Sequence, residues 1–342
     1  NQNSATSTLQ LDGSDGDITL AQPVLINGRN NTTPAIESLA GNNTFSGNLS
    51  LGSGGSVYPL QSDSGTLTLG GVVGIHALTS GRTLTFQGDG DFLVSGVITN
   101  GSSTANSVVK VGAGTLTMSG VNTYTGTTTL NAGTLLVNGV VGTNALTVVA
   151  GTLGGAGVIR GPVSVQAEAT LAPGNSAGIL TVSNSVSLAG FTVMELNRAG
   201  APNSDRLAAA SVAYGGTLIV TNIGGTLQVN DTFDLFDWTG SRTGVFSNLV
   251  LPAGYTWDTG NLAVNGTIRV AAVPSPLLAY TLANGMISFA WTGDYKLQCQ
   301  TNTLSAGLGA GWFDYDGGDA SPVAVGVDTS SGTVFFRLAP KP

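Results

Sequence analysis

The sequence predicts an all-β fold in which short strands coil into a parallel β-solenoid, and three observations support that prediction. Apolar residues alternate with threonine in runs such as Thr66–Leu69, Thr115–Met118 and Thr217–Val220, so one face of each run is apolar. Glycine accounts for 51 of 342 residues, about twice its usual share, and together with asparagine it separates the runs. Good helix formers are scarce, since the chain contains three Glu and three Lys.

The predicted strands are about three to five residues long, and the turns between them are equally short. This spacing is typical of a solenoid rather than of a Greek-key sandwich. Leu and Val would fill the interior, and Gly and Asn would occupy corners that need a positive φ. At roughly 20 residues per coil, the solenoid would have about 13 coils and a length of about 60 Å. The best helix candidate is Ser204–Tyr214, which contains a run of alanines.

Two pairs of similar segments indicate that the chain repeats itself. Gly120–Gly126 matches Gly41–Gly47, and Gly114–Gly120 is similar to Gly65–Gly70. Because both pairs share the same alternation, internal repetition explains them better than chance does.

The segment Gly112–Gly139 (GAGTLTMSGVNTYTGTTTLNAGTLLVNG) closely resembles the autotransporter-associated β-strand repeat. That repeat is a glycine-punctuated element of the passenger regions of secreted bacterial surface proteins. Leu171–Gly178 (LAPGNSAG) is similar to the linker that often follows such repeats. The resemblance implies a right-handed parallel β-helix on the outside of a cell, and it implies no catalysis.

A change in composition near residue 273 predicts two domains. Residues 1–272 are expected to form the β-solenoid, with an aromatic cap at about residues 231–270 whose large side chains would close the last coil. Residues 273–276 (Val-Pro-Ser-Pro) are interpreted as a stiff linker. Residues 277–342 contain 9 of the 22 aromatic residues and are predicted to form a small, β-sandwich-like, all-β module.

Charge and composition exclude several classes of protein. The eleven basic residues are outnumbered by nineteen acidic ones and are spread too thinly for nucleic-acid binding. No apolar stretch of about 18 residues is present that could span a membrane as a helix. The first residues, Asn-Gln-Asn-Ser, are typical of a mature N-terminus after signal-peptide removal, so we expect an extracellular or cell-surface protein. The single cysteine, Cys299, excludes a disulfide framework within the chain and is interpreted as a small apolar interior residue.

The search for catalytic, cofactor-binding and metal-binding residues predicts none, and we therefore expect no enzyme. Three acidic clusters are interleaved with glycine and are interpreted as solvated turns: Asp12, Asp15 and Asp17; Asp89 and Asp91; and Asp314, Asp316 and Asp319. The single histidine, His76, lies in an apolar, strand-like context and is interpreted as structural. Gly154–Gly157 has no following helix that would make it a phosphate site. A carbohydrate-binding platform is an alternative use of three aromatic residues, although core packing explains them more readily: Trp291, Trp312 and Tyr315.

Sparse charge and open solenoid ends together predict self-association. Charged residues make up 9% of the chain, whereas soluble domains keep about a quarter or more of their surface charged. The ends of a solenoid also display unpaired backbone groups. We therefore expect a non-enzymatic extracellular structural protein that assembles head to tail into a filament or coat, with Ser4–Leu11 adding as a strand to a neighbour. Two alternatives stay open, a monomeric passenger-type adhesin that binds surface glycans and an enzyme that acts on polysaccharide.

Overall fold

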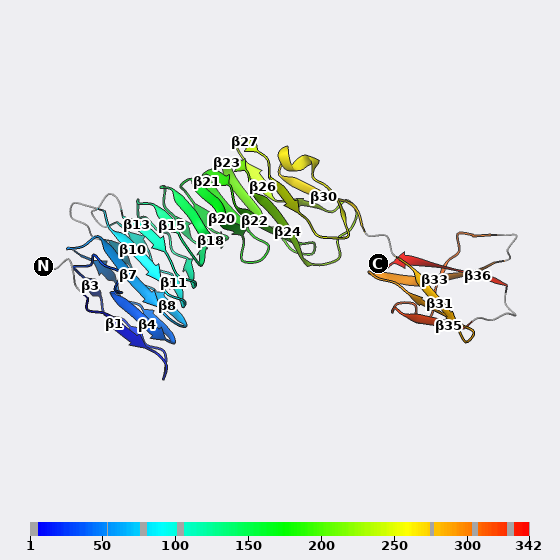
Figure 1. The fold of residues 1–342 in the computed structure, drawn as a ribbon, viewed down its shortest axis with the longest axis horizontal. Helices are drawn as coiled ribbons and strands as arrows, with labels where there is room; N and C mark the ends of the chain where they lie inside the picture. Colours follow the sequence, from blue (N-terminus) through cyan, green and yellow to red (C-terminus); the bar gives the residue numbers. More distant parts are fainter. Residues whose placement is uncertain are drawn as a thin grey trace. The chain divides into compact units, whose positions relative to one another are not determined.

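The structure is a computed structural model, which describes residues 6–52, 54–75, 81–100, 106–273, 277–302, 307–326 and 332–341 (Figure 1). The chain divides into two compact units: unit 1 comprises Asn1–Ala253 and Trp257–Ala271, and unit 2 comprises Gly254–Thr256 and Ala272–Pro342. Within the described residues the secondary structure is almost entirely β, and the helical element given there is the 3-10 turn η2 (Gly260–Ala263).

Unit 1 is a parallel β-solenoid, which confirms the predicted fold class. Its coils stack one upon the next, and each strand pairs in parallel with strands of the neighbouring coils (Figure 1). The first face consists of β1 (Leu9–Asp12), β4 (Ile36–Ala40), β7 (Val57–Ser62), β10 (Thr83–Gln87), β13 (Ser107–Lys110), β15 (Thr128–Leu130), β18 (Leu146–Gly155), β20 (Val163–Pro173), β21 (Ile179–Leu188), β23 (Arg206–Tyr214) and β27 (Arg242–Gly244).

The second and third faces follow the same order of coils. The second face consists of β2 (Thr19–Leu20), β5 (Asn42–Phe45), β8 (Thr66–Leu69), β11 (Asp91–Val94), β14 (Thr115–Met118), β16 (Thr134–Val137), the later parts of β18 and β20, β22 (Phe191–Asn197), β24 (Thr217–Gly224) and β28 (Asn248–Val250). The third face consists of β3 (Val24–Ile26), β6 (Leu49–Leu51), β9 (Val73–Ile75), β12 (Ile98–Thr99), β17 (Val140–Val141), β19 (Val158–Ile159), the early parts of β21 and β23, and β26 (Phe236–Trp238).

The coils differ in length, which corrects the uniform coil length expected from the sequence. The step along the chain from Thr83 to its partner Ser107 in the next coil is longer than the step from Leu146 to its partner Val163. Towards the end of the solenoid the step widens again, since Val212 pairs with Arg242. The described residues therefore form eleven rungs on the first face instead of about 13, or roughly 50 Å of stacked coils.

The alternation of apolar residues and threonine places the apolar residues inside. Leu67, Phe92 and Leu116 pair with one another in successive coils and are fully buried. Thr66 and Thr115, which alternate with them, lie on the outer side of the same strands and are half-buried. The interior is thus a set of apolar columns parallel to the solenoid axis, and threonine hydroxyl groups alternate with them on the outer side of these strands.

Glycine forms one corner of the solenoid, between the first and second faces. Gly112 and Gly133 have φ values of +78° and +73°, in the left-handed region that side chains with a Cβ rarely adopt. A Cβ at Gly133 would lie 2.4 Å from the carbonyl oxygen of Gly112 in the preceding coil. Close stacking of the coils at this corner therefore requires glycine twice over, for the φ angle and for the space.

The helix candidate Ser204–Tyr214 was wrong, because Arg206–Tyr214 is strand β23. Leu207 pairs with Leu180 of the preceding coil and with Phe236 of the following one. A strand between two coils has partners for its backbone groups on both edges, and this outweighs the helix preference of three alanines.

The last coils contain aromatic side chains and antiparallel strands. The rings of Tyr214 and Phe246 stack with centroids 4.6 Å apart, and Phe236 packs 4.9 Å from Tyr214. Just before the parallel strand β26, β25 (Thr232–Asp234) pairs antiparallel with β30 (Thr267–Ala272) in a separate sheet that also contains β29 (Thr256–Asp258).

Unit 2 contains two small antiparallel sheets, as predicted for the C-terminal module. One consists of β31 (Ala279–Ala283), β32 (Met286–Ala290) and β35 (Val323–Gly326), and the other of β34 (Phe313–Asp314), β33 (Tyr295–Asn302) and β36 (Thr333–Pro340). Residues from both sheets form one apolar core: Phe289, Trp291, Leu297 and Val325.

Candidate functional site

Three acidic residues of the two N-terminal clusters, Asp12, Asp17 and Asp91, accept hydrogen bonds from backbone N–H groups at turns between strands. Asp17 accepts a hydrogen bond from the N–H of Asn42 at 2.7 Å, and Asp91 accepts one from the N–H of Thr115 at 2.7 Å. Asp12 accepts the N–H of Ser14, and hydrogen bonds from the side chain of Ser14 first and its backbone second lower the pKa of the Asp12 carboxyl. Asp15 and Asp89 lie exposed on turns. The carboxylates of Asp17 and Asp91 therefore connect one coil to the next, which is a structural role.

The acidic cluster of unit 2 is arranged differently. The carboxylate of Asp314 lies 2.7 Å from the Lys296 ammonium and 2.8 Å from the amide nitrogen of Gln298. The bond from Lys296 is the main cause that lowers the pKa of Asp314. Asp316 and Asp319 are exposed. In the part of the chain that the structure describes, no three His, Cys, Asp or Glu side chains gather in a way that could hold a metal ion.

The remaining sequence candidates take up structural positions or lie outside the described residues. His76 lies outside them. Gly154 and Gly155 end strand β18, and Gly155 forms a bridge with Gly174, so Gly154–Gly157 belongs to the coil stack. Cys299 is a free, half-buried thiol.

The three aromatic candidates do not form one platform. Trp291 belongs to the core of unit 2, and Tyr315 packs against that core. Trp312 is half-buried, and the guanidinium of Arg337 lies 4.4 Å from its ring centroid. A sugar would have to stack on the other side of the Trp312 ring, without help from Trp291.

Corner asparagines fasten neighbouring coils, and sequence reasoning assigned them only to turns. Asn122 is fully buried, and its Oδ1 accepts the N–H of Ile98 at 2.9 Å. Its Nδ2 donates to the carbonyl oxygens of Gly120 and Val140. Asn43 accepts a backbone N–H from the first coil in the same way. A signal for this role is an Asn that precedes Thr and an aromatic residue, as in both GNNTF and GVNTY.

One lysine lies in the apolar interior, and the sequence analysis missed it. Lys110 occupies the column between Phe86 and Leu130 and is fully buried. Its Nζ donates to the carbonyl oxygens of Val111 and Gly112, both at 2.8 Å. Burial lowers the pKa of Lys110 to about 8, although the carboxylates of the nearby corner act in the opposite direction. The alternation in Ser-Val-Val-Lys could have revealed it, since Lys110 shares a face with Val108.

A buried carboxylate ties together the later coils. Asp205 is fully buried, and its two oxygens accept the N–H groups of Gly178 at 2.9 Å and Glu195 at 2.8 Å. Burial raises the pKa of Asp205 to about 7 against the opposing effect of these two bonds. Gly178 ends the segment Leu171–Gly178, so Asp205 holds that segment against the following coils.

The two tips of the solenoid expose side chains that belong to its core columns. Leu9 occupies the column of Ile36 but is 40% exposed, and strand β1 has one strand partner among the described residues, β4. At the other end Leu249 occupies the column of Leu218 but is 37% exposed. Each residue would be buried if one more coil were stacked upon it. In the described chain, β1 at one tip and β27 and β28 at the other thus have one strand partner each, whereas next to β26 the carbonyl oxygen of Gly266 accepts the N–H groups of Leu235 and Phe236.

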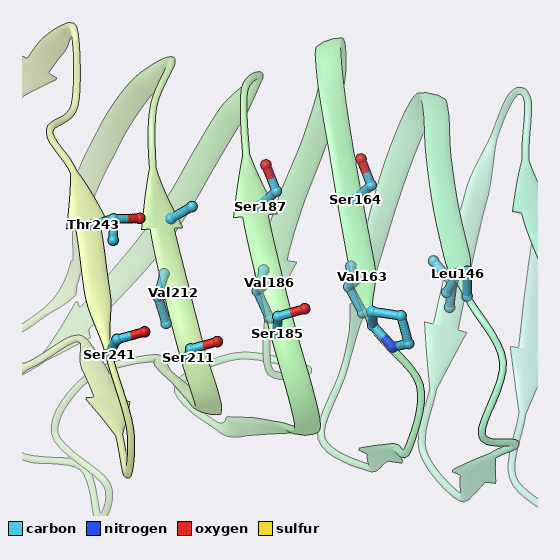
Figure 2. Close-up of a pocket in the computed structure, with 13 residues that line it drawn as sticks. Leu146, Val163, Ser164, Ser185, Val186, Ser187, Ser211, Val212, Ser241 and Thr243 are labelled. Atoms are coloured by element: carbon cyan, nitrogen blue, oxygen red, sulfur yellow. The ribbon is translucent and has the colours of Figure 1, made fainter.

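A groove of about 380 Å³ lies on the first face, across β18, β20, β21, β23 and β27 (Figure 2). Small side chains line it in rows, because Ser164 pairs with Ser187, and Ser185 with Ser211, in successive coils. Figure 2 shows these hydroxyl groups, with Ser241, on neighbouring strands of one face. The valines that alternate with these serines point into the solenoid interior, and the apolar part of the outer lining includes Ala145, Pro162 and Ala213. The groove therefore combines neutral hydroxyl groups with small apolar side chains, and no charged residue lines it.

Two comparisons relate the chain to known proteins. Residues 108–137 match the passenger-associated-transport-repeat family. The chain is also 40% identical over 75 residues to a Serratia marcescens protein named extracellular serine protease. That similarity covers 22% of this chain and 7% of the Serratia protein, so the chain spans a small part of that relative. The described residues contain no helix long and apolar enough to cross a membrane. The passenger-type repeat predicted from Gly112–Gly139 is thereby confirmed.

Proposed function

We propose that this chain is a non-enzymatic structural protein on the outside of a bacterial cell, whose solenoid associates head to tail with further copies. A secreted or surface location is supported by the passenger-type repeat at residues 108–137 and by the similarity to an extracellular protein of Serratia marcescens. A structural role is supported by Asp17, Asp91 and Asn122, whose side chains make hydrogen bonds between neighbouring coils.

The observation that carries the proposal is the exposure of Leu9 and Leu249 at opposite tips. A second copy stacked on either tip would continue the column of core side chains and offer partners to the strand edges. Because the two tips differ, the contact is heterologous and gives an open-ended filament. Association would use the edges of β27 and β28 at one end and the first coil at the other.

Electron microscopy of three lysine variants tests this arrangement. Leu9→Lys and Leu249→Lys each place a charge on one tip, so each protein alone should fail to form filaments. An equimolar mixture should form dimers, because one intact tip of each kind is then available. Val121→Lys is the matched control, since Val121 is 52% exposed on the side of a middle coil, and it should form filaments like the unmodified chain. Monodisperse, unassembled wild-type protein, or filaments from both tip variants, would contradict the proposal.

A second candidate function, glycan binding by a passenger-type adhesin, is favoured by the groove of Figure 2. Its neutral hydroxyl groups and small apolar lining residues match a sugar ring, which has hydroxyl groups at its edge and C–H groups on its faces. Ser187→Arg would fill the groove, and Ser50→Arg would add the same charge to the outer side of the third face. Binding on a glycan array that Ser187→Arg abolishes and Ser50→Arg retains would support this function, and an array without binding would exclude it for the sugars presented.

A further inference from the structure

Strand β31 of unit 2 is an edge strand whose five residues are all exposed. Two of its side chains are large and apolar: Tyr280 is 71% exposed and Leu282 is 68% exposed. In the segment just before the strand, Leu277 is also exposed. Edge strands with this much open apolar surface are uncommon in monomers, because they serve as templates for another strand.

The exposed side chains lie on the core side of their sheet. Tyr280 pairs with Phe289 and Leu282 pairs with Ile287 across the antiparallel β31–β32 ladder, and directly opposite residues share a face. Phe289 is buried in the core of unit 2, and Ile287 packs against it. The second sheet covers those two residues but leaves Tyr280 and Leu282 open. The core face of unit 2 thus continues onto a strand that nothing in the described part of unit 2 covers.

The strand also lacks the devices that usually protect an edge. Ala279–Ala283 contains no charged residue and no proline, and its ladder with β32 has no bulge. The opposite edge strand, β35, is also uncharged, but it is shorter and its Val325 is buried. In the other sheet, the edge strand β34 carries Asp314 and the edge strand β36 carries Arg337. Two copies of an uncharged strand can approach without like-charge repulsion, which a charged edge would impose on a copy of itself.

We propose that β31 is a self-association edge, at which a second copy of the chain adds its own β31 in antiparallel orientation. A two-fold axis at the central residue, Thr281, would place Tyr280 opposite the partner's Leu282 and Leu282 opposite the partner's Tyr280. These pairs would then be cross-strand neighbours on one continuous apolar face. The same contact would satisfy the open backbone groups of both edges and join two three-stranded sheets into one of six strands.

This contact differs from the head-to-tail contact in position and in symmetry. An isologous contact closes after two copies, whereas stacking of solenoid tips continues without limit. A single strand pair buries less than a standard interface of about 1,600 Å², so the dimer should be weak and dependent on concentration. In a filament, the two contacts together would join neighbouring filaments side by side.

Cysteine cross-linking of the full chain tests the register. In a Leu9→Lys, Cys299→Ser background, which disables one tip and removes the native thiol, Thr281→Cys places the two new thiols opposite each other across the two-fold axis. Directly opposite residues of an antiparallel pair lie about 4.5–5.5 Å apart between Cα atoms, within disulfide range. Oxidised glutathione should convert this protein to a covalent dimer. Ala324→Cys, on the exposed edge strand β35, is the matched control and should stay monomeric.

Sedimentation of the same background without the new cysteines tests the energetics. The parent should show a concentration-dependent dimer, and Leu282→Lys should shift dimerisation to at least tenfold higher concentration. A parent that stays monomeric at every concentration would overturn the proposal, as would equal cross-linking at residues 281 and 324 or a Leu282→Lys variant that dimerises normally. The Leu9→Lys substitution disables the tip contact in all these proteins. A parent that does not dimerise would therefore contradict the β31 contact without contradicting head-to-tail assembly. Conversely, absence of wild-type filaments would contradict head-to-tail assembly without contradicting the β31 dimer.

Discussion

Lys110 makes the stability of the solenoid depend on pH in a direction that surface lysines do not produce. The pKa of its ammonium falls from an ordinary value of 10.5 to about 8 because the group is buried between Phe86 and Leu130. Below pH 8 the folded state bears the full cost of the buried charge, about 3 kcal/mol relative to the unfolded chain. As the pH rises from 8 to 10.5, the folded protein loses this proton before the unfolded chain does, and the cost disappears. Stability should therefore increase with pH across that window.

Replacing Lys110 with Met removes the titrating group and keeps an unbranched side chain of similar length. We expect the free energy of unfolding of the wild-type solenoid to rise by about 2 kcal/mol between pH 7.5 and 9.5. In Lys110→Met the rise should be close to zero. Staying below pH 10 avoids the tyrosines, because burial raises the pKa of Tyr58 and stability from such groups is lost only above the ordinary tyrosine value of 10.

Urea unfolding followed by circular dichroism at several pH values measures this difference. Lys296→Met is the control, since Lys296 pairs with Asp314 in unit 2 and should leave the pH dependence of the solenoid unchanged. The absolute stability of Lys110→Met at pH 7 balances relief from the buried charge against loss of the bonds to Val111 and Gly112, so the slope is the decisive quantity. If Lys110→Met kept the wild-type slope, the account of Lys110 as the buried titrating group would be refuted.

Three further changes test individual contacts between the coils. Asn122→Ala leaves the buried N–H of Ile98 without its partner, whereas the carbonyl oxygens of Gly120 and Val140 keep backbone N–H donors, and it should cost about 1–3 kcal/mol in urea unfolding. Asn138→Ala, at an exposed corner, should cost less. Gly133→Ala combines an unfavourable φ with a Cβ clash and should lower the melting temperature more than Gly260→Ala, whose Cβ meets a side-chain oxygen no closer than 3.3 Å. Asp205→Asn should remove a loss of stability that the wild type shows from pH 4 to pH 7, because burial raises the pKa of Asp205 to about 7 and disfavours its charged form; an unchanged pH profile would refute that role.

The sequence predicted the fold class because the same physical requirement recurs in every coil. Where apolar residues alternate with threonine in coil strands such as Thr66–Leu69 and Thr115–Met118, the strand has one buried and one half-buried side in the structure. The similarity of Gly114–Gly120 to Gly65–Gly70 is a true equivalence, since Thr115 and Thr66 lie in the same column, two coils apart. Local pattern was sufficient for these features, because each is decided within a few residues.

Features that depend on partners from other coils were harder to predict. Gly41–Gly47 and Gly120–Gly126 are similar in sequence but occupy different corners: Asn42 begins strand β5 of the second face, whereas Val121 bridges to Val140 near the third face. The number of residues in each coil likewise depends on which strands pair, and it could not be predicted from the spacing of glycines and apolar residues in the sequence. The open tips are a further case, because Leu9 and Leu249 look like ordinary strand residues until the absence of a neighbouring coil exposes them.

The position of the family match within the stack also bears on function. Residues 108–137 lie where the coils become shorter, since the step from Thr83 to its partner Ser107 is longer than the step from Thr134 to its partner Thr152. The third face is reduced there to the bridge between Val121 and Val140. The matched residues therefore supply two successive rungs of the first face (β13 and β15) and of the second face (β14 and β16), in narrow coils that have neighbours on both sides.

Residues 108–137 pack against neighbouring coils on both sides, so their sequence is determined by that packing rather than by the binding of a partner. What distinguishes this chain from other stacks of the same repeat should accordingly reside where stacking ends, at Leu9, at Leu249 and at strand β31. These positions are exposed and lie at edges, so a charge placed there meets solvent in the single chain and meets an apolar surface only in an assembly. Charged substitutions at these positions should therefore change assembly without unfolding a coil.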